Sequence, residues 1–218
     1  MKRIILFAII IMSRLVGWLI STDASPLLTK QTDKWKLAYA PPVKGHLYDC
    51  HTMRTANGVK TWVVGEKGQI ALQDEWGNWF VQSSGTNADL WDVFFITAEI
   101  GWVVGGLCHQ LSEAIILHTT NGGQNWTPQS AGVLGLGVAC VFTDINHGWV
   151  AIQWIPSSSK APLQGYILRT TNGGANWQAV PIPYHTQPEW PTQPFPHGLF
   201  FIDSATGWLT GCELNPVN

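Results

Sequence analysis

The segment ILHTTNGGQNW at residues 116–126 recurs as ILRTTNGGANW at residues 167–177, with nine of eleven letters identical. Each copy joins an apolar, β-branched run to Asn-Gly-Gly and then to a tryptophan. This is the pattern of a strand, a tight turn and a returning strand, because Asn and Gly tolerate the left-handed backbone of tight turns. We therefore expect a structural role for the residues of the two turns. They are Asn121, Gly122, Gly123 and Trp126 in the first copy, and Asn172, Gly173, Gly174 and Trp177 in the second.

The composition favours an all-β protein. The chain has 218 residues, of which 22 are Gly, 13 Pro and 13 Trp, numbers that favour short strands and many turns. Only 12% of the residues are charged, about half of the usual share of roughly 25%. No segment after residue 30 combines a sustained 3.6-residue apolar period with helix caps.

A longer repeat contains the duplicated segment. Each unit has an apolar phrase, then a Gly-Trp phrase or its equivalent, then the strand-turn-Trp phrase. The tryptophans of the second phrase are spaced 40, 47 and 59 residues apart, at Trp62, Trp102, Trp149 and Trp208. Such a period is typical of propeller blades.

The second repeat shows how one blade is built. LWDVFFI (90–96) is its first strand, GWVVGG (101–106) its second and AIILHTT (114–120) its third, and the fourth begins at the next Asn-Trp. We expect the Gly before each Trp to let the first turn close, while the Trp packs between sheets. The predicted fold is a β-propeller of four-stranded antiparallel blades, incomplete, with about three full blades and part of a fourth. The predicted blades cover about residues 47–84, 90–131, 136–183 and 197–218.

The order of apolar strand, Gly-Trp, apolar strand and Thr-Asn-Gly-Gly-x-x-Trp resembles the photosystem II assembly/stability-factor-like family. These are β-propellers with bacterial-neuraminidase repeats, also called Asp-boxes. The resemblance covers about residues 47–212 and is most specific in the second and third repeats, where Asn121 and Asn172 replace the common Asp. It implies a structural turn and a scaffold that binds protein, possible partners including a membrane complex, which in photosynthetic organisms is photosystem II.

Both ends of the repeat array depart from this pattern. The first repeat has Asp74, Glu75 and Trp76 in the Asn-Gly-Gly positions, so its turn must differ. Residues 25–46 form a lead in which Trp35 resembles the tryptophan of a fourth strand, a candidate for closing the ring. Since propellers have about four to eight blades, we expect a truncated gene product or an incomplete piece, or else copies that associate to close the ring. An open arc exposes a sheet edge and an apolar flank, which favours aggregation or partner binding.

Residues 1–24 resemble an export signal. Lys2 and Arg3 precede the apolar run 4–12, and Thr22 and Ala24 offer a small-x-small cleavage site. The alternative is an uncleaved membrane anchor. We expect an exported protein that is periplasmic, extracellular or anchored to the membrane.

The net charge limits the classes of binding partner. The net charge is −2, and cleavage after residue 24 leaves 9 basic and 13 acidic residues, a charge of −4. Nucleic acid and anionic membrane surfaces are therefore poor partners.

The four cysteines allow three pairings in an exported chain. Cys50 and Cys140 occupy one position of the repeat, where Val93 also lies, which favours buried apolar thiols.

Three long segments are predicted on the propeller face opposite the Asn-Gly-Gly turns: 107–114, 154–165 and the proline-rich 181–196. Stiff aromatic loops suit contact with a protein or a carbohydrate. The alternative is that the aromatics fold onto the propeller rim. The candidate partner-binding residues are Trp154, Tyr184, Trp190 and Phe195.

Catalysis is not expected. A sialidase site needs three arginines, and the chain after residue 24 has only Arg54 and Arg169. Asp49 and Asp92 share one repeat position, where we expect them to cap a turn or face the central channel rather than form a glycosidase pair. No metal or cofactor motif is present, so we expect neither. The competing function is a carbohydrate-binding or glycosidase-related Asp-box propeller at the cell surface.

Overall fold

The computed structural model describes residues 41–108, 112–153, 165–182 and 196–211 in full. It describes the strand segments 18–19, 27–31, 34–38, 186–187, 190–191, 193–195 and 212–214 through their backbone alone. Within this part of the chain, no helix is long and apolar enough to cross a membrane.

Four antiparallel sheets make up the main body, and we call them blades 1 to 4. Blade 1 contains β4 (Leu47–Thr55), β5 (Gly58–Gly65), β6 (Gln69–Gln73) and β7 (Trp79–Ser83), with the short helix η1 (Glu66–Gly68) between β5 and β6. Blade 2 contains β8 (Asp89–Phe95), β9 (Gly101–Gly106), β10 (Glu113–Thr119) and β11 (Thr127–Leu134). Blade 3 contains β12 (Leu136–Phe142), β13 (Gly148–Gln153), β14 (Tyr166–Thr170) and β15 (Gln178–Pro181). Blade 4 contains β18 (Gln193–Phe201) and β19 (Gly207–Leu214).

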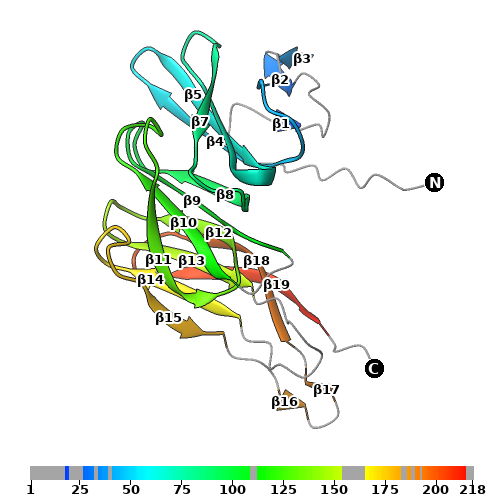
Figure 1. Ribbon diagram of the computed structural model, residues 1–218, viewed down its shortest axis with the longest axis vertical. Helices are drawn as coiled ribbons and strands as arrows, with labels where there is room; N and C mark the ends of the chain where they lie inside the picture. Colours follow the sequence, from blue (N-terminus) through cyan, green and yellow to red (C-terminus); the bar gives the residue numbers. More distant parts are fainter. Residues whose placement is uncertain are drawn as a thin grey trace, which may run out of the picture.

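The blades are arranged as a partial propeller. In blades 1 to 3 the strands lie in chain order across each sheet. The first strand of each blade contacts the first strand of the next, so that β4, β8, β12 and β18 form a row. Figure 1 shows the blades following one another from blade 1 to blade 4. The predicted fold class, an incomplete propeller with three four-stranded blades and part of a fourth, is confirmed.

A repeated aromatic stack joins each blade to the next. Trp62 on β5 stacks on Phe95 of β8 with ring centroids 3.7 Å apart, and Trp102 on β9 stacks on Phe142 of β12 at 3.5 Å. Trp149 on β13 stacks on Phe201 of β18 at 3.8 Å. Trp62, Trp102 and Trp149 are at most 4% exposed. These three tryptophans of blades 1 to 3 are therefore core residues between the sheets.

The glycines before Trp102 and Trp149 make room for the phenylalanine rings of this stack. A Cβ on Gly101 would lie 2.5 Å from the Phe95 ring, and one on Gly148 would lie 2.2 Å from the Phe142 ring. Neither glycine has a positive φ. Space for the phenylalanine ring at the end of the hairpin therefore requires these glycines, and an unusual backbone conformation does not.

The Asn-Gly-Gly turns tie each blade to the preceding one. In blade 2, Gly122 and Gly123 have φ of 70° and 87°. The carbonyl oxygen of Gly122 accepts hydrogen bonds from Trp62 Nε1 at 3.1 Å and Gln82 Nε2 at 2.9 Å, both in blade 1. In blade 3, the carbonyl of Gly173 accepts equivalent bonds from blade 2, where the donors are Trp102 and Gln129.

The equivalent turn of blade 1 has a different construction. Asp74 Oδ1 accepts hydrogen bonds from the N–H groups of Trp76 at 3.0 Å and Asn78 at 2.7 Å, and Gly77 has φ of 88°. The side chain of Trp76 is 76% exposed. The sequence-based expectation of a different turn in this repeat agrees with this geometry.

Before blade 1, the described backbone contains a separate three-stranded sheet. Its strands are β1 (Trp18–Leu19), β2 (Leu27–Gln31) and β3 (Lys34–Ala38). Trp35 lies in β3, which pairs with β2 and not with blade 4. The candidate ring-closing strand therefore belongs to another sheet in this structure.

Candidate protein-binding surface

The four aromatic residues predicted to bind a partner lie at the margin of the described structure. Trp154 and Tyr184 are outside the described residues. Trp190 belongs to β17 (Trp190–Pro191), which pairs with β16 (Thr186–Gln187). Phe195 was expected in a loop, but it lies in β18, opposite Cys212. The aromatic-loop surface therefore stays a prediction, and so does the carbohydrate-binding alternative that depends on it.

A different surface is evident on blade 4. Its second strand, β19, pairs with β18 along one edge and, in the described part of the chain, with no strand along the other. The equivalent strands β5, β9 and β13 are each paired on both edges. The outer edge of β19 therefore presents unpaired backbone N–H and C=O groups, which can accept an added strand.

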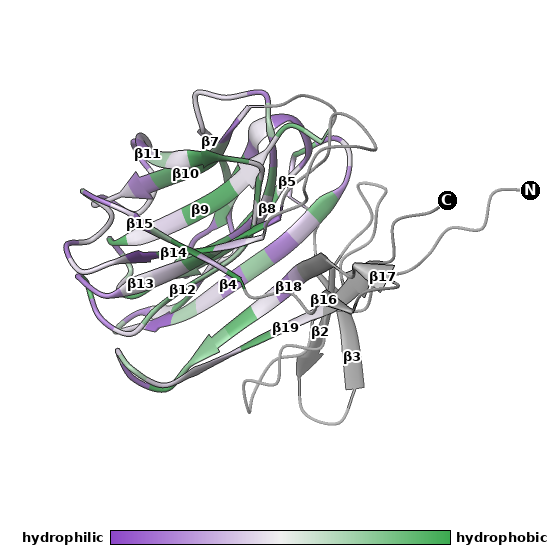
Figure 2. Ribbon diagram, turned by 90° about the horizontal axis from the view of Figure 1, so that it is seen from below, coloured by the Kyte–Doolittle hydropathy of each residue, from purple (hydrophilic) through white to green (hydrophobic). Residues whose placement is uncertain are grey.

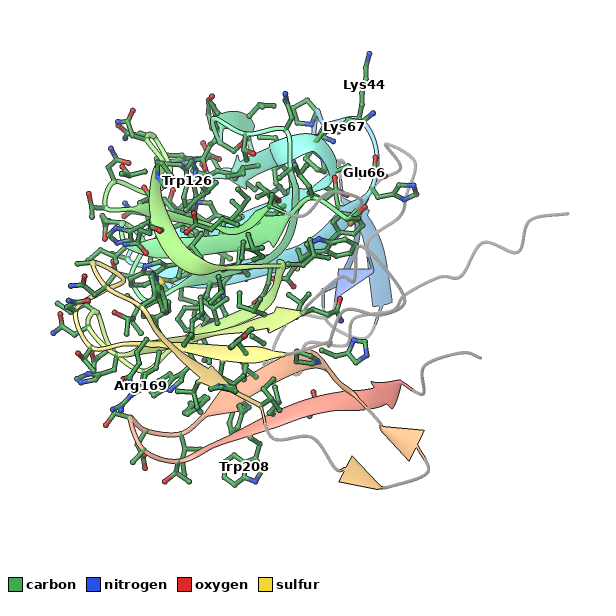
Figure 3. The ribbon with its side chains drawn as sticks, turned by 60° about the horizontal axis from the view of Figure 1, so that its bottom comes forward. Lys44, Glu66, Lys67, Trp126, Arg169 and Trp208 are labelled. Atoms are coloured by element: carbon green, nitrogen blue, oxygen red, sulfur yellow. The ribbon has the colours of Figure 1, made fainter. Side chains whose placement is uncertain are left out.

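Three large apolar side chains are exposed beside this edge. Phe200 and Ile202 are each 60% exposed and Trp208 is 55% exposed, and we call these three residues the blade-4 flank. Phe200 pairs across the hairpin with Trp208. Figure 3 shows the Trp208 side chain projecting away from the other sheets, and Figure 2 shows hydrophobic colouring on β18 and β19.

Blade 2 shows what such residues do when a neighbour is present. Phe94, Ile96 and Trp102 occupy the positions equivalent to Phe200, Ile202 and Trp208. Trp102 belongs to the buried core between blades 2 and 3, and Phe94 and Ile96 are partly buried and pack against that core. The blade-4 flank thus has the composition of a buried interface while it is exposed, which is typical of a docking surface.

The sequence analysis predicted an exposed apolar flank without identifying its residues. The signal was present, since GWLTGC (207–212) repeats the Gly-Trp phrase. The flank was not singled out because proline-rich aromatic loops were favoured as binding elements.

The two aspartates considered for a glycosidase pair connect blades instead. Asp49 Oδ2 accepts a hydrogen bond from Val93 N at 3.0 Å, and Asp92 Oδ2 accepts one from Cys140 N. Each bond therefore runs from the first strand of one blade to the first strand of the next. These carboxyls therefore do not cap a turn, and the alternative that they face the central channel stays a prediction. In the third blade Ala139 occupies this position, and it has no carboxyl group.

The two carboxyl groups are also hydrogen-bonded to each other. Burial raises the pKa of Asp49 well above its ordinary value, and the nearby Asp92 carboxyl adds to the shift. Burial also raises the pKa of Asp92, although its hydrogen bonds oppose the shift. Such a pair holds a proton at pH values where an exposed aspartate has lost it.

The cysteines of the same strands are buried thiols. Cys50 and Cys140 are each 6% exposed and form no disulfide. Burial raises the pKa of Cys50 to about 12 and raises that of Cys140 as well. Cys108 is also a free thiol. Among the described residues, no group of three or more His, Cys, Asp and Glu side chains is placed to hold a metal ion.

Comparison with known proteins identifies no family for this chain. No protein-family model matches the chain, and no curated protein matches it. Among solved structures, "YCF48 bound to D1 peptide" is similar, with 12% sequence identity and a TM-score of 0.43 over 94% of this chain and 89% of that one. At this level of similarity, nothing about the partner of the present chain follows from the comparison.

Proposed function

We propose that this chain is an exported, non-catalytic β-propeller scaffold that binds a protein partner, as the resemblance to photosystem II assembly/stability factors implies. The observation that carries the proposal is the exposed blade-4 flank beside the open edge of β19. The junctions between blades 1 and 2 and between blades 2 and 3 bury the same kind of surface. Aromatic side chains, tryptophan above all, supply much of the binding energy in protein interfaces.

The geometry of the paired carboxyls supports a non-catalytic scaffold. Asp49 is buried, and the hydrogen bonds of each aspartate are made with the next blade and with the other aspartate. A glycosidase pair must instead face its substrate from opposite sides of a cleft. These two carboxyls therefore hold blades together.

Site-specific photo-crosslinking tests the proposal. A photoreactive phenylalanine analogue replaces Trp208 in the full chain, and in a matched control it replaces Phe80 on β7, which is 52% exposed. We expect one defined protein partner to crosslink at position 208 and not at position 80, and to be lost when Phe200→Ala is added. Equal capture at both positions, or none at 208, contradicts the proposal.

Export is proposed from the basic residues and apolar run at the start of the chain. A fusion of residues 1–40 to alkaline phosphatase, which is active only after export, provides the test. We expect activity from this fusion and none when two aspartates are introduced into the apolar run 4–12. Activity that survives the aspartates contradicts the export proposal.

A further inference from the structure

We propose that Asn57 is a covalent modification site, where the folded chain loses the side-chain amide by deamidation and aspartate or isoaspartate takes its place. The reaction needs only water, and it depends neither on export nor on a partner. It begins when the backbone nitrogen of Gly58 attacks Cγ of Asn57. A glycine at the second position favours this attack, because it has no side chain to keep the two atoms apart.

The reaction balances without any other reagent. A bond forms between Gly58 N and Asn57 Cγ, the Cγ–Nδ2 bond breaks, and ammonia leaves with the proton of the backbone nitrogen. A cyclic succinimide remains, and water opens it at either carbonyl. Opening at one carbonyl gives an ordinary aspartate, and opening at the other gives isoaspartate, in which the main chain runs through the side-chain carbon. Each product carries a negative charge that asparagine lacks.

The chain contains the Asn-Gly dipeptide three times, at Asn57, Asn121 and Asn172. The second and third copies belong to the Asn-Gly-Gly turns, whereas Asn57 lies in the loop between β4 and β5. Asn57 and Asn172 are both exposed. Exposure alone therefore does not distinguish the three copies, and their hydrogen bonds must be compared.

Both reacting groups are held in place at Asn121. Its Oδ1 accepts hydrogen bonds from Thr119 Oγ1 and from Asn125 N, each at 3.0 Å. The nitrogen that would attack, Gly122 N, donates a hydrogen bond to Glu99 O at 2.8 Å. Ring closure at Asn121 therefore requires the loss of hydrogen bonds on both the amide and the attacking nitrogen.

The copy at Asn172 has the same three hydrogen bonds. Its Oδ1 accepts from Thr170 Oγ1 at 2.9 Å and from Asn176 N at 3.0 Å. Gly173 N donates to Asn146 O at 3.0 Å. Both Asn-Gly-Gly turns are also bonded to the preceding blade through the carbonyl of their first glycine. The fold therefore protects these two asparagines, because opening either turn also disturbs a junction between blades.

Asn57 lacks this protection within the described part of the chain. Its side chain makes no hydrogen bond there, and its backbone N–H donates to Thr55 Oγ1 at 3.3 Å. Gly58 pairs with Thr55 at the last position of the β4–β5 ladder. The end of a ladder opens at little cost in free energy. Gly58 N is therefore released for attack without unfolding of the blade.

The modification changes the surface of blade 1. Thr55 Oγ1 donates a hydrogen bond to Glu75 Oε1 at 3.0 Å, and Lys60 Nζ lies 3.6 Å from the same oxygen. These contacts hold the end of the hairpin against the turn between β6 and β7, as Figure 1 shows. Isoaspartate adds a carbon to the main chain of a two-residue loop, so Thr55 and Gly58 cannot pair as before. The end of the hairpin then separates from that turn.

The test follows deamidation of the folded full chain in mildly alkaline buffer by mass spectrometry, with an unincubated sample as the reference. Trypsin releases Asn57 in TANGVK (55–60), and chymotrypsin releases the other two copies in HTTNGGQNW (118–126) and RTTNGGANW (169–177). Each conversion adds about one mass unit, and liquid chromatography separates the two products. We expect Asn57 to react at least about tenfold faster than Asn121 or Asn172.

Unfolding provides the first control. In guanidinium chloride the hydrogen bonds at Asn121 and Asn172 are lost, and we expect all three sites to react at similar rates. Equal rates in the folded chain overturn the inference, as does an Asn57 that reacts only in the unfolded chain. A preference for Asn57 that is equally large in guanidinium chloride also overturns it, since the local sequence and not the fold then sets the rate.

The variant Thr119→Val tests the cause of the protection. It removes the hydroxyl that donates to Asn121 Oδ1 and accepts from Gly123 N. We expect several-fold faster deamidation at Asn121, while Asn57 and Asn172 of the same molecules keep their rates and serve as internal references. An unchanged rate at Asn121, or an equal acceleration at Asn172, contradicts the protective role of these hydrogen bonds.

Discussion

Strands β9 and β19 occupy the same place in successive repeats, yet one is buried and the other is exposed. Their sequences are GWVVGG at residues 101–106 and GWLTGC at residues 207–212. All six residues of β9 are buried, whereas residues 207–211 of β19 are all exposed. Trp102 is 0% exposed and Trp208 is 55% exposed.

The difference shows that burial in this fold depends on neighbours rather than on the strand itself. β9 has β8 and β10 on its two edges and blades 1 and 3 on its two faces. β19 has β18 on one edge, and the contacts of blade 4 with blade 3 run from β18 to β12 and β13. Where a neighbouring strand or blade is missing, the apolar side chains of a Gly-Trp strand stay exposed. A partner can bind these side chains.

The two tryptophans provide the largest test of this comparison. Trp102 stacks on Phe142 and donates its indole N–H to Gly173 O at 3.3 Å. We expect Trp102→Ala to lower the free energy of unfolding by about 3–5 kcal/mol, and Trp208→Ala to lower it by less than about 1 kcal/mol. Urea unfolding followed by circular dichroism measures both. Similar losses would show that Trp208 is packed in the folded chain.

The inner strands differ in their response to acid, through His51 of blade 1 and Phe94 at the equivalent position of blade 2. Burial lowers the pKa of His51 to about 4. The folded state therefore binds this proton later than the unfolded chain, whose histidine has a pKa near 6.5. The contribution of His51 to stability is complete above pH 6.5 and falls by up to about 1.4 kcal/mol per pH unit towards pH 4.

His51→Phe checks this pH dependence, because it installs the blade 2 residue. We expect the variant to lose less stability between pH 6.5 and pH 4 than the unmodified chain, by about 2–3 kcal/mol. The measurement is urea unfolding at a series of pH values. A variant with an unchanged pH profile shows that another group controls the acid response.

The glycines before Trp149 and Trp208 are expected to differ less in how much stability the chain loses when each is replaced by Ala. A Cβ on Gly148 meets the Phe142 ring, which is 3% exposed and enclosed between Trp102 and Trp177. We expect Gly148→Ala to cost about 1–3 kcal/mol of unfolding free energy. The same change at Gly207 should cost less, because the Phe201 ring is only partly buried and can shift. Thermal unfolding of the two variants measures both losses of stability. A larger loss for Gly207→Ala than for Gly148→Ala contradicts this explanation.

The carboxyl pair gives the smallest expected effect. Because burial raises the pKa of Asp49 and Asp92, their protonated form favours folding, and this contribution is lost as the pH rises through the folded-state pKa values. Asp92→Asn keeps an oxygen that accepts from Cys140 N and adds a donor for Asp49. We expect stability that falls less, by about 1 kcal/mol, as the pH rises above the ordinary aspartate pKa of about 3.9, as measured by urea unfolding. A steeper fall contradicts the shared-proton interpretation.

The sequence predicted the blades well because their signals are local. The Gly-Trp spacing located the second strands, and the Asn-Gly-Gly turns located the third and fourth. The start of β18 was missed, since Pro194 and Pro196 within Gln193–Phe201 are typical of a loop. The blade-to-blade bonds of Asp49 and Asp92 were missed because they join residues 44 and 48 positions apart, and no local pattern encodes them.

The site was less predictable than the fold for the same reason. Trp208 has the sequence context of Trp102, and only the absence of neighbouring strands and sheets distinguishes it. Exposure is a property of the assembled arc, so the blade-4 flank could be identified by residue only once the blades were placed.

Hydrogen–deuterium exchange of the full chain tests the central claim, that the edge of β19 is a binding surface, most directly. The exchange of residues 207–214 is followed with and without the protein partner captured by crosslinking at position 208, and residues 79–83 of β7 serve as the internal reference. We predict slower exchange in β19 and unchanged exchange in β7. Unchanged exchange in β19, or equal slowing in both edge strands, would contradict the claim.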